Sequence, residues 1–270
     1  MRILTTPWKN ELLELVSTTK KSIKIISPYI KENICQALLL QKQSQAKFEL
    51  ITTFKFSSFC SGQSDLSALE KIINANGKIK IHPRIHSNVF LFDDKKAIIS
   101  SANLSDRGLL TNYEFGILLD EKTVVAQVVA EYNAIAKHEE TRAVKKADIE
   151  IISKMLLPIS KNSQYKKLKL SKFETDHLKE TFDVVDIPIE AITSVFENWQ
   201  LEVFNCINLT QQQIFTLEEV NLFENHLKKI FPAQKNIPDK IEIQLKYFID
   251  LGLIDFLGNG FYKKLWRWDK

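Results

Sequence analysis

Cysteine and histidine are scarce in this chain of 270 residues, which has three of the first and five of the second. The three cysteines, Cys35, Cys60 and Cys206, are odd in number and lack the paired spacing of a zinc site or a disulfide framework. The five histidines, at positions 82, 86, 138, 177 and 226, are not accompanied by a Cys/His set of the kind that holds a catalytic metal. We therefore expect no metal and no cofactor, so that any hydrolysis would proceed without a tightly held metal ion.

Long apolar runs are also missing. No stretch approaches the roughly 20 consecutive apolar residues that a membrane-spanning helix needs. Hydrophobic residues make up 44% and charged residues 26% of the chain, values typical of soluble proteins. The segment Met1 to Lys9 is polar and lacks the apolar core and cleavage site of a secretory signal. These features predict a cytoplasmic protein with no membrane partner.

Charge is unevenly distributed along the chain. The formal net charge is +4, yet residues 181–270 contain nine basic and thirteen acidic residues. The basic excess therefore falls in the first two thirds of the sequence. Such an excess suits a polyanionic partner for the N-terminal half, although its size alone is weak support.

The length favours two domains, because 270 residues exceed the usual size of one. We predict a domain at 1–138, a linker with some helix at 139–186 and a second domain at 187–270. Helical and alternating patterns in the first domain predict an α/β fold. The expected helices cover 11–19, 65–75 (with Gly77 as its C-cap) and 122–137, and the expected strands cover 23–27, 46–53, 78–82, 88–92, 97–100 and 113–119.

The second domain has the pattern of a winged helix. Amphipathic helices are expected at 199–207, 217–231 and 237–251, followed by a β-hairpin around Gly258-Asn259-Gly260. Thr216 and Glu219 have the spacing of a capping box at the start of the second helix. The predicted fold class is thus α/β with a mainly α C-terminal domain.

One segment has the spacing of a known catalytic motif. His86 is followed by Asp93 after six residues, and then by Ser100-Ser101-Ala102-Asn103. This arrangement resembles the phospholipase D superfamily signature H-x-K-x4-D-x6-G-S-x-N. Asn112-Tyr113-Glu114-Phe115-Gly116 resembles the N-x-E-x-G tail of the nuclease branch of that superfamily. The resemblance covers about residues 8–137 and implies a phospholipase-D-like mixed sheet flanked by helices.

Phosphodiester cleavage without a metal explains why these residue types are needed. An imidazole can attack phosphorus and can also protonate a leaving oxygen, so His86 is the candidate nucleophile and a phosphohistidine the candidate intermediate. Ser101 and Asn103 can donate to the non-bridging phosphate oxygens. The resemblance implies that Glu114 orients the His86 ring, and we expect Asp93 to support its loop rather than take part in chemistry.

Two departures from the signature bear on activity. The chain has one motif, whereas the mechanism of the superfamily uses two histidines, so the resemblance implies a homodimer that pairs two copies of His86. Asn88 stands at the position of the signature lysine. Losing one donor to a developing negative charge typically costs about 10²–10³ in rate. Either a neighbouring cation such as Arg84 substitutes, or Asn88 was introduced to disable the protein, or the site is naturally inactive.

Residues 197–268 resemble the winged helix that ends Dam-replacing-type restriction proteins. The matching features are the Lys240-Ile241 helix and the Gly258-Asn259-Gly260 wing, while Glu242 and Ile249 replace two arginines of that pattern. The expected contacts to double-stranded DNA are Lys240, Gln244, Lys246 and Asn259. A purely structural or dimerising winged helix remains an alternative, because the domain is acidic.

Together the two halves predict a restriction-type DNA endonuclease that acts on double-stranded DNA without metal, within a system that includes a cognate DNA methyltransferase. The alternative is a non-catalytic DNA-binding or regulatory protein with a degenerate phospholipase-D-like fold. Phospholipid transphosphatidylation is a weaker third hypothesis, since the chain has no second motif.

Overall fold

The computed structural model describes residues 1–161 and 185–268, and the chain divides into two compact units. Unit 1 comprises Met1–Phe54 and Gln63–Ile149, and unit 2 comprises Lys55–Gly62 and Glu150–Lys270. The lysine run 166–169, in the predicted linker, lies outside the described residues.

Unit 1 is built on a mixed sheet of eight strands in the order β1-β7-β6-β5-β2-β3-β4-β8. Strands β2, β3 and β4 pair in parallel, and the other pairings are antiparallel. The strands are β1 (Arg2–Thr5), β2 (Ser22–Ile26), β3 (Lys47–Thr52), β4 (Lys78–Ile81), β5 (Asn88–Phe92), β6 (Lys96–Ser100), β7 (Phe115–Leu119) and β8 (Arg142–Ala143).

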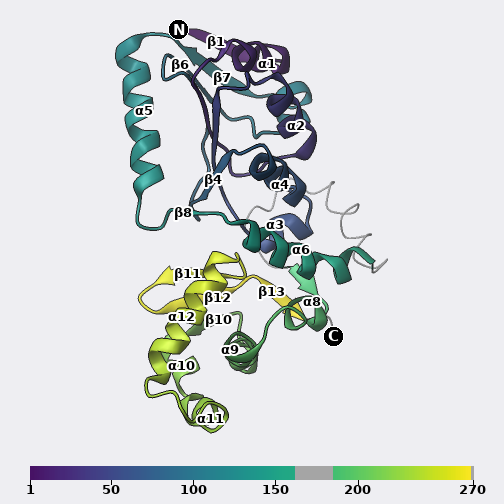
Figure 1. The fold of residues 1–270 in the computed structure, drawn as a ribbon, viewed down its shortest axis with the longest axis vertical. Helices are drawn as coiled ribbons and strands as arrows, with labels where there is room; N and C mark the ends of the chain where they lie inside the picture. The colour runs from purple at the N-terminus through teal and green to yellow at the C-terminus, as the bar shows by residue number, and fades with distance from the viewer. Residues whose placement is uncertain (162–184, 269–270) are drawn as a thin grey trace. The chain divides into compact units, whose positions relative to one another are not determined.

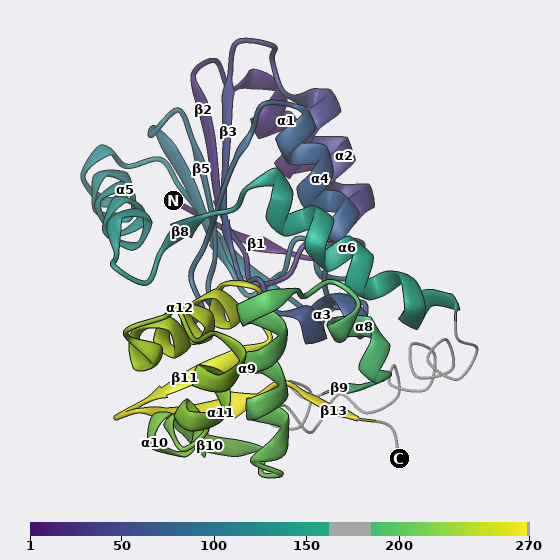
Figure 2. The ribbon, with the colours of Figure 1, turned by 60° about the horizontal axis from the view of Figure 1, so that its bottom comes forward.

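Helices cover both faces of this sheet (Figure 1, Figure 2). On one face lie α1 (Lys9–Thr18), α2 (Glu32–Gln41) and α4 (Leu66–Asn74), whose apolar residues are buried. On the other face, α5 (Lys122–Lys137) packs Val125 and Tyr132 against Ile26, Leu91 and Leu119. The predicted α/β sheet flanked by helices is thereby confirmed.

The central hairpin forms as its sequence predicts. β5 and β6 are joined by a turn in which Asp93 and Asp94 have φ of 54° and 55°. This left-handed conformation is one that Asp tolerates through its short polar side chain. The prediction that Gly77 caps the helix at 65–75 is wrong, because Asn76 takes the left-handed conformation (φ 58°). Gly77 is required for space: a Cβ there would lie 2.5 Å from Cγ2 of Ile72.

Unit 2 contains the expected winged helix. Its three-stranded sheet has the order β10-β12-β11, and Gly258, Asn259 and Gly260 all have positive φ in the connecting turn. Beside it, β9 (Val185–Ile187) pairs in parallel with β13 (Trp266–Trp268). The remaining elements are α3 (Phe56–Cys60), α8 (Ile189–Thr193), α9 (Asn198–Leu209), β10 (Ile214–Thr216), α10 (Leu217–Asn221), α11 (Glu224–Ile230), α12 (Ile237–Asp250), β11 (Ile254–Gly258) and β12 (Phe261–Lys264).

The helix predicted over 217–231 is two helices. Its start is as expected, because Thr216 accepts a hydrogen bond from the Glu219 N–H while the Glu219 carboxylate accepts from the Thr216 N–H. The helix then ends at Asn221, a weak helix former, and α11 begins at Glu224. Two further helical elements complete the described residues. One is a π-helical turn at Arg107–Thr111 in unit 1, and the other is α6 (Lys146–Lys161), within which unit 1 ends at Ile149 and unit 2 resumes at Glu150.

Across the described ranges 1–161 and 185–268, no helix has both the length and the apolar character needed to cross a membrane.

Candidate active site

The signature residues gather where three neighbouring strands end. Asn88 begins β5, Ser100 ends β6, and Gly116 lies near the start of β7, and these three residues are cross-strand partners. The segment before β5, the segment after β6 and the segment before β7 therefore share one edge of the sheet. This edge brings together His86, Asn88, Ser101 and Glu114.

Asn88 is buried and fully engaged. Its side chain is 3% exposed, its Oδ1 accepts a hydrogen bond from Ser27 Oγ at 2.7 Å, and its Nδ2 donates to the Ser101 carbonyl at 3.2 Å. The amide thus ties the end of β2 to the segment after β6. An amide held in this way is not presented to a phosphate at the surface.

Ser101 and Glu114 form a direct contact at the same edge. Both side chains are solvent-accessible, and the Ser101 hydroxyl donates to the Glu114 carboxylate, which also accepts from Asn112 Nδ2 at 3.2 Å. Ser101 Oγ in turn accepts from the Phe115 N–H at 3.2 Å. The Glu114 carboxylate is hydrogen-bonded to Ser101 and Asn112 of its own chain, and the expected contact with His86 is not formed among the described residues.

His86 is exposed on the short segment between β4 and β5. Among the described residues, none forms a hydrogen bond or ion pair with its ring. The imidazole is therefore open to a substrate or to a second polypeptide. Asn103 is half-buried, and its backbone carbonyl lies against Gly108, where a Cβ would come within 2.6 Å of that oxygen.

Asp93 lies at the opposite end of β5 from the site. Its carboxylate accepts from the backbone N–H groups of Lys20, Lys21 and Ser22 at 2.9, 2.6 and 3.0 Å. Partial burial alone would raise the pKa of Asp93, but these three donors lower it below its ordinary value. Its role is to join the β5–β6 turn to the start of β2.

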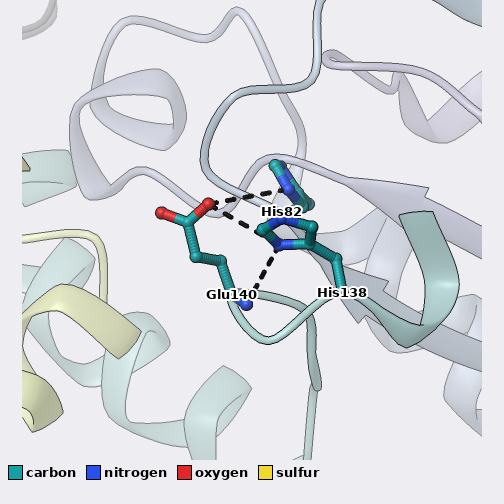
Figure 3. Close-up of side chains that lie close together, drawn as sticks. All are labelled: His82, His138 and Glu140. Carbon is teal, nitrogen blue, oxygen red and sulfur yellow. Dashed lines mark hydrogen bonds and ion pairs between the residues drawn. The ribbon is translucent and has the colours of Figure 1, made fainter. Parts of the chain in front are cut away.

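Sequence reasoning missed one cluster of ionisable side chains. The histidines look unclustered along the chain, yet the fold brings His82, His138 and Glu140 together, with ligand-type atoms all within 4.8 Å of one another (Figure 3). Burial lowers the pKa of His82, an effect that nearby Glu140 partly offsets. No local signal marks this group, because 56 residues separate the two histidines.

Three of the expected DNA contacts of unit 2 lie on α12, and the fourth lies in the turn between β11 and β12. Ile237, Ile241, Leu245 and Phe248 form the buried side of this helix. Lys240 and Gln244 are half-buried on its flank, whereas Lys246 and the wing residue Asn259 are exposed. The exposed side of α12 also carries Asp239 and Glu242, so acidic groups accompany the single lysine there.

Two family models of known proteins match two separate parts of the chain. Residues 12–136 match a family model described as "Cardiolipin synthase, PLD-like domain", and residues 196–264 match one described as "Dam-replacing HTH domain". The chain is similar to cardiolipin synthase 1 of Bacillus anthracis and of Bacillus cereus, with 26% identity over 163 residues in both cases. Each match covers 56% of this chain and 32% of the relative, so the chain spans about a third of the length of these curated proteins.

Among solved structures, the chain is similar to Nuc, a phospholipase D family member from Salmonella typhimurium, with 14% identity and a TM-score of 0.47. That match covers 54% of this chain and 97% of Nuc. It is also similar to NucT from Helicobacter pylori, with 20% identity, a TM-score of 0.45, and coverage of 53% and 98%.

Proposed function

We propose that this chain, which joins a phospholipase-D-like domain at residues 12–136 to a Dam-replacing HTH domain at residues 196–264, is a restriction-type DNA endonuclease that cleaves without metal. The observation that carries the proposal is the shared edge of β5, β6 and β7. There an exposed imidazole, His86, accompanies the hydroxyl of Ser101 and the carboxylate of Glu114, in a chain that also has an HTH domain.

In the proposed reaction, an unprotonated nitrogen of His86 attacks phosphorus, so that a P–N bond forms and the bond to the leaving DNA oxygen breaks. His86 of a second copy gives its proton to that oxygen. Water then attacks the phosphohistidine, returns a proton to the second histidine and releases the first. Ser101 and Asn103 donate to the non-bridging oxygens, where negative charge develops.

Glu114 would orient the His86 ring. Because the Glu114 carboxylate is bonded to Ser101 and Asn112 within its own chain, this role needs either a rotation of the side chain or Glu114 of the second copy. Both routes are consistent with a site that is completed only when DNA and two chains assemble.

An exposed apolar row supports a homodimer. Ile3 pairs with Ile117 across β1 and β7, and Ile117 pairs with Ile99 across β7 and β6. These residues are 68%, 41% and 42% exposed, and Phe115, two residues from Ile117 and next to Glu114, is 70% exposed. Contiguous exposed apolar surface of this kind typically marks an interface. Its position beside the site would bring two copies of His86 together about a two-fold axis.

Unit 2 would supply DNA recognition, with α12 in the major groove and Lys240, Gln244 and Lys246 as contacts, and with Asn259 of the wing beside the backbone. The acidic residues on α12 predict modest affinity, because few counterions are released. A gel shift of the full chain against its Lys240→Ala/Gln244→Ala variant tests this assignment. Unchanged binding and sequence preference would transfer recognition to unit 1. A cognate DNA methyltransferase would protect the host sites.

The second candidate is a non-catalytic DNA-binding or regulatory protein. The buried, doubly hydrogen-bonded side chain of Asn88 favours it, because the position of the signature lysine then offers no charge to the phosphate. Arg84, the neighbouring cation considered as a substitute, is held by the Glu140 carboxylate in this structure.

Plasmid cleavage in excess EDTA separates the two candidates. The nuclease proposal expects slow nicking that persists in EDTA and disappears in His86→Ala. The matched control is His226→Ala, which removes an exposed histidine from unit 2. Strict dependence on magnesium, or equal nicking by His86→Ala, would refute the mechanism.

A further inference from the structure

The cluster formed by His82, His138 and Glu140 has the composition of a transition-metal site and lies apart from the signature residues. His82 follows β4, His138 caps the end of α5, and Glu140 lies in the connection from α5 to β8, so two segments of unit 1 meet there (Figure 3). Glu140 Oε2 is 3.9 Å from His82 Nε2 and 3.6 Å from His138 Nδ1. The two imidazole rings are 5.0 Å apart between centroids.

These distances are close to those around a bound ion. Zinc binds imidazole nitrogens at about 2.0–2.1 Å and carboxylate oxygens at about 2.0–2.2 Å. Tetrahedral geometry then places neighbouring ligand atoms roughly 3.3 Å apart. The two carboxylate–imidazole distances need to close by about half an ångström, and the imidazole nitrogens, which lie within 4.8 Å of each other, by up to about 1.5 Å. Rotation of the partly exposed side chains of His138 and Glu140 can supply these movements.

The exposure of the three side chains suits an ion with an open coordination position. His82 is buried, with 10% of its side chain exposed, whereas His138 and Glu140 are 41% and 34% exposed. The buried His82 would hold such an ion on its inner side, and the side of the ion near His138 and Glu140 would face solvent. Two imidazoles and one carboxylate, with water in the fourth position, form a common zinc ligand set.

Metal binding must compete with contacts that already exist. The Nδ1 atoms of His82 and His138 each accept a backbone N–H at 3.2 Å, from Arg84 and Glu140 respectively. The Arg84 guanidinium also forms an ion pair with the Glu140 carboxylate. A metal ion would replace these contacts by three coordinate bonds. The Arg84 guanidinium would then be released from Glu140, so it competes with the metal for this carboxylate.

We propose that His82, His138 and Glu140 bind one divalent transition-metal ion of the zinc class, which fastens the start of the 82–87 segment to the end of α5. His86 lies in this segment, but the ion takes no part in the proposed cleavage chemistry. In its absence the Arg84–Glu140 ion pair holds the same two segments.

The test is metal binding by the full chain, stripped with chelator and dialysed, with any affinity tag removed. Zinc affinity is measured by competition with a chromophoric chelator, and cobalt is used to report the ligand set. We expect one equivalent of metal per chain and an upward shift of the unfolding temperature of the stripped protein on adding zinc. Cobalt absorption should lack a thiolate charge-transfer band.

Four variants make the assignment specific. His138→Gln and Glu140→Gln should each weaken binding by more than the roughly 10–100-fold that loss of an outer-shell partner costs. The matched control His226→Gln removes a histidine that lies 4.0 Å from Glu202 and has no third ligand group among residues 1–161 and 185–268, and it should bind as the parent does. Arg84→Ala should tighten binding by up to about fivefold, the equivalent of a surface ion pair.

Circular dichroism of the metal-free variants checks that they are folded. Binding below one equivalent, unchanged affinity in Glu140→Gln, a thiolate band, or weaker binding in Arg84→Ala would each overturn the proposed site. None of these measurements depends on nuclease activity.

Discussion

Replacing Asn88 by lysine tests both the chemistry and the packing of the candidate site. The substitution restores the residue of the signature, but it also removes an amide that accepts from Ser27 at 2.7 Å and donates to the Ser101 carbonyl at 3.2 Å. Because Asn88 is only 3% exposed, a lysine must either keep its ammonium near these groups or extend it toward the site.

The cost in stability follows from the two hydrogen bonds. A net value of about 0.5–1.5 kcal/mol for each gives a loss of about 2 kcal/mol, because the Ser27 hydroxyl keeps the Tyr29 carbonyl as an acceptor at 2.9 Å. For a domain of this size that loss lowers the unfolding temperature by roughly 4–8 °C. The gain in rate should be about 10²–10³, the typical value of one charge-stabilising donor in the transition state.

Single-turnover nicking of supercoiled plasmid in EDTA measures the rate, and thermal unfolding measures the stability. Asn10→Lys, on the exposed side of α1, adds the same charge away from the site and should change neither. The double variant His86→Ala/Asn88→Lys should lose the whole gain, because the nucleophile is absent.

Cooperative unfolding of Asn88→Lys without faster cleavage than the parent chain would refute this expectation. Position 88 would then not limit the chemistry, and the non-catalytic DNA-binding function would be favoured. An unchanged unfolding temperature would instead contradict the energetic role assigned to the amide of Asn88.

Three further results are expected from the contacts in unit 1. Ile117→Asp should convert a particle of about twice the 31.2 kDa chain mass into a monomer by light scattering, and an unchanged mass would exclude the apolar row as the interface. Asp93→Asn should destabilise the chain by about 1–2 kcal/mol at pH 7 in denaturant unfolding. The lowered pKa of Asp93 stabilises the fold at pH values above the ordinary aspartate range, so the stability difference between the parent and Asp93→Asn should shrink as the pH falls through the lowered pKa. Asp94→Asn is the control and should have only the smaller effect of losing a surface ion pair. Gly108→Ala should displace Asn103, since the new Cβ meets its carbonyl at 2.6 Å, and should cost about 1–3 kcal/mol and slow any cleavage.

Strand pairing around the signature could be predicted because it depends on short-range pattern. Short apolar runs on both sides of Asp93-Asp94 specify the β5–β6 hairpin, and the spacing to Ser101 then places that residue at the same edge as Asn88. The capping box at Thr216 is equally local. Elements without such signals were missed: β1 is short and three of its four residues are exposed, and the ten residues of α2 have no N-terminal side-chain cap.

Long-range contacts could not be predicted from the sequence. The hydrogen bond from Ser27 to Asn88 joins residues 61 positions apart, and the cluster at Glu140 includes a histidine 58 positions away from it. The signature therefore predicts which residues share an edge, but not whether each side chain points to the substrate or into the protein. For Asn88 that difference decides between the two candidate functions.

The assignment of residues 55–62 to unit 2 has a consequence for how such proteins can be recombined. The backbone N–H of Phe56 donates to the Gly252 carbonyl, and Phe56 and Phe59 are 1% and 4% exposed. A gene fusion that exchanged only the C-terminal segment would separate these two buried aromatic residues from the unit to which they belong. Exchange of the C-terminal domain between relatives should therefore require that the α3 segment, encoded far upstream, changes together with unit 2.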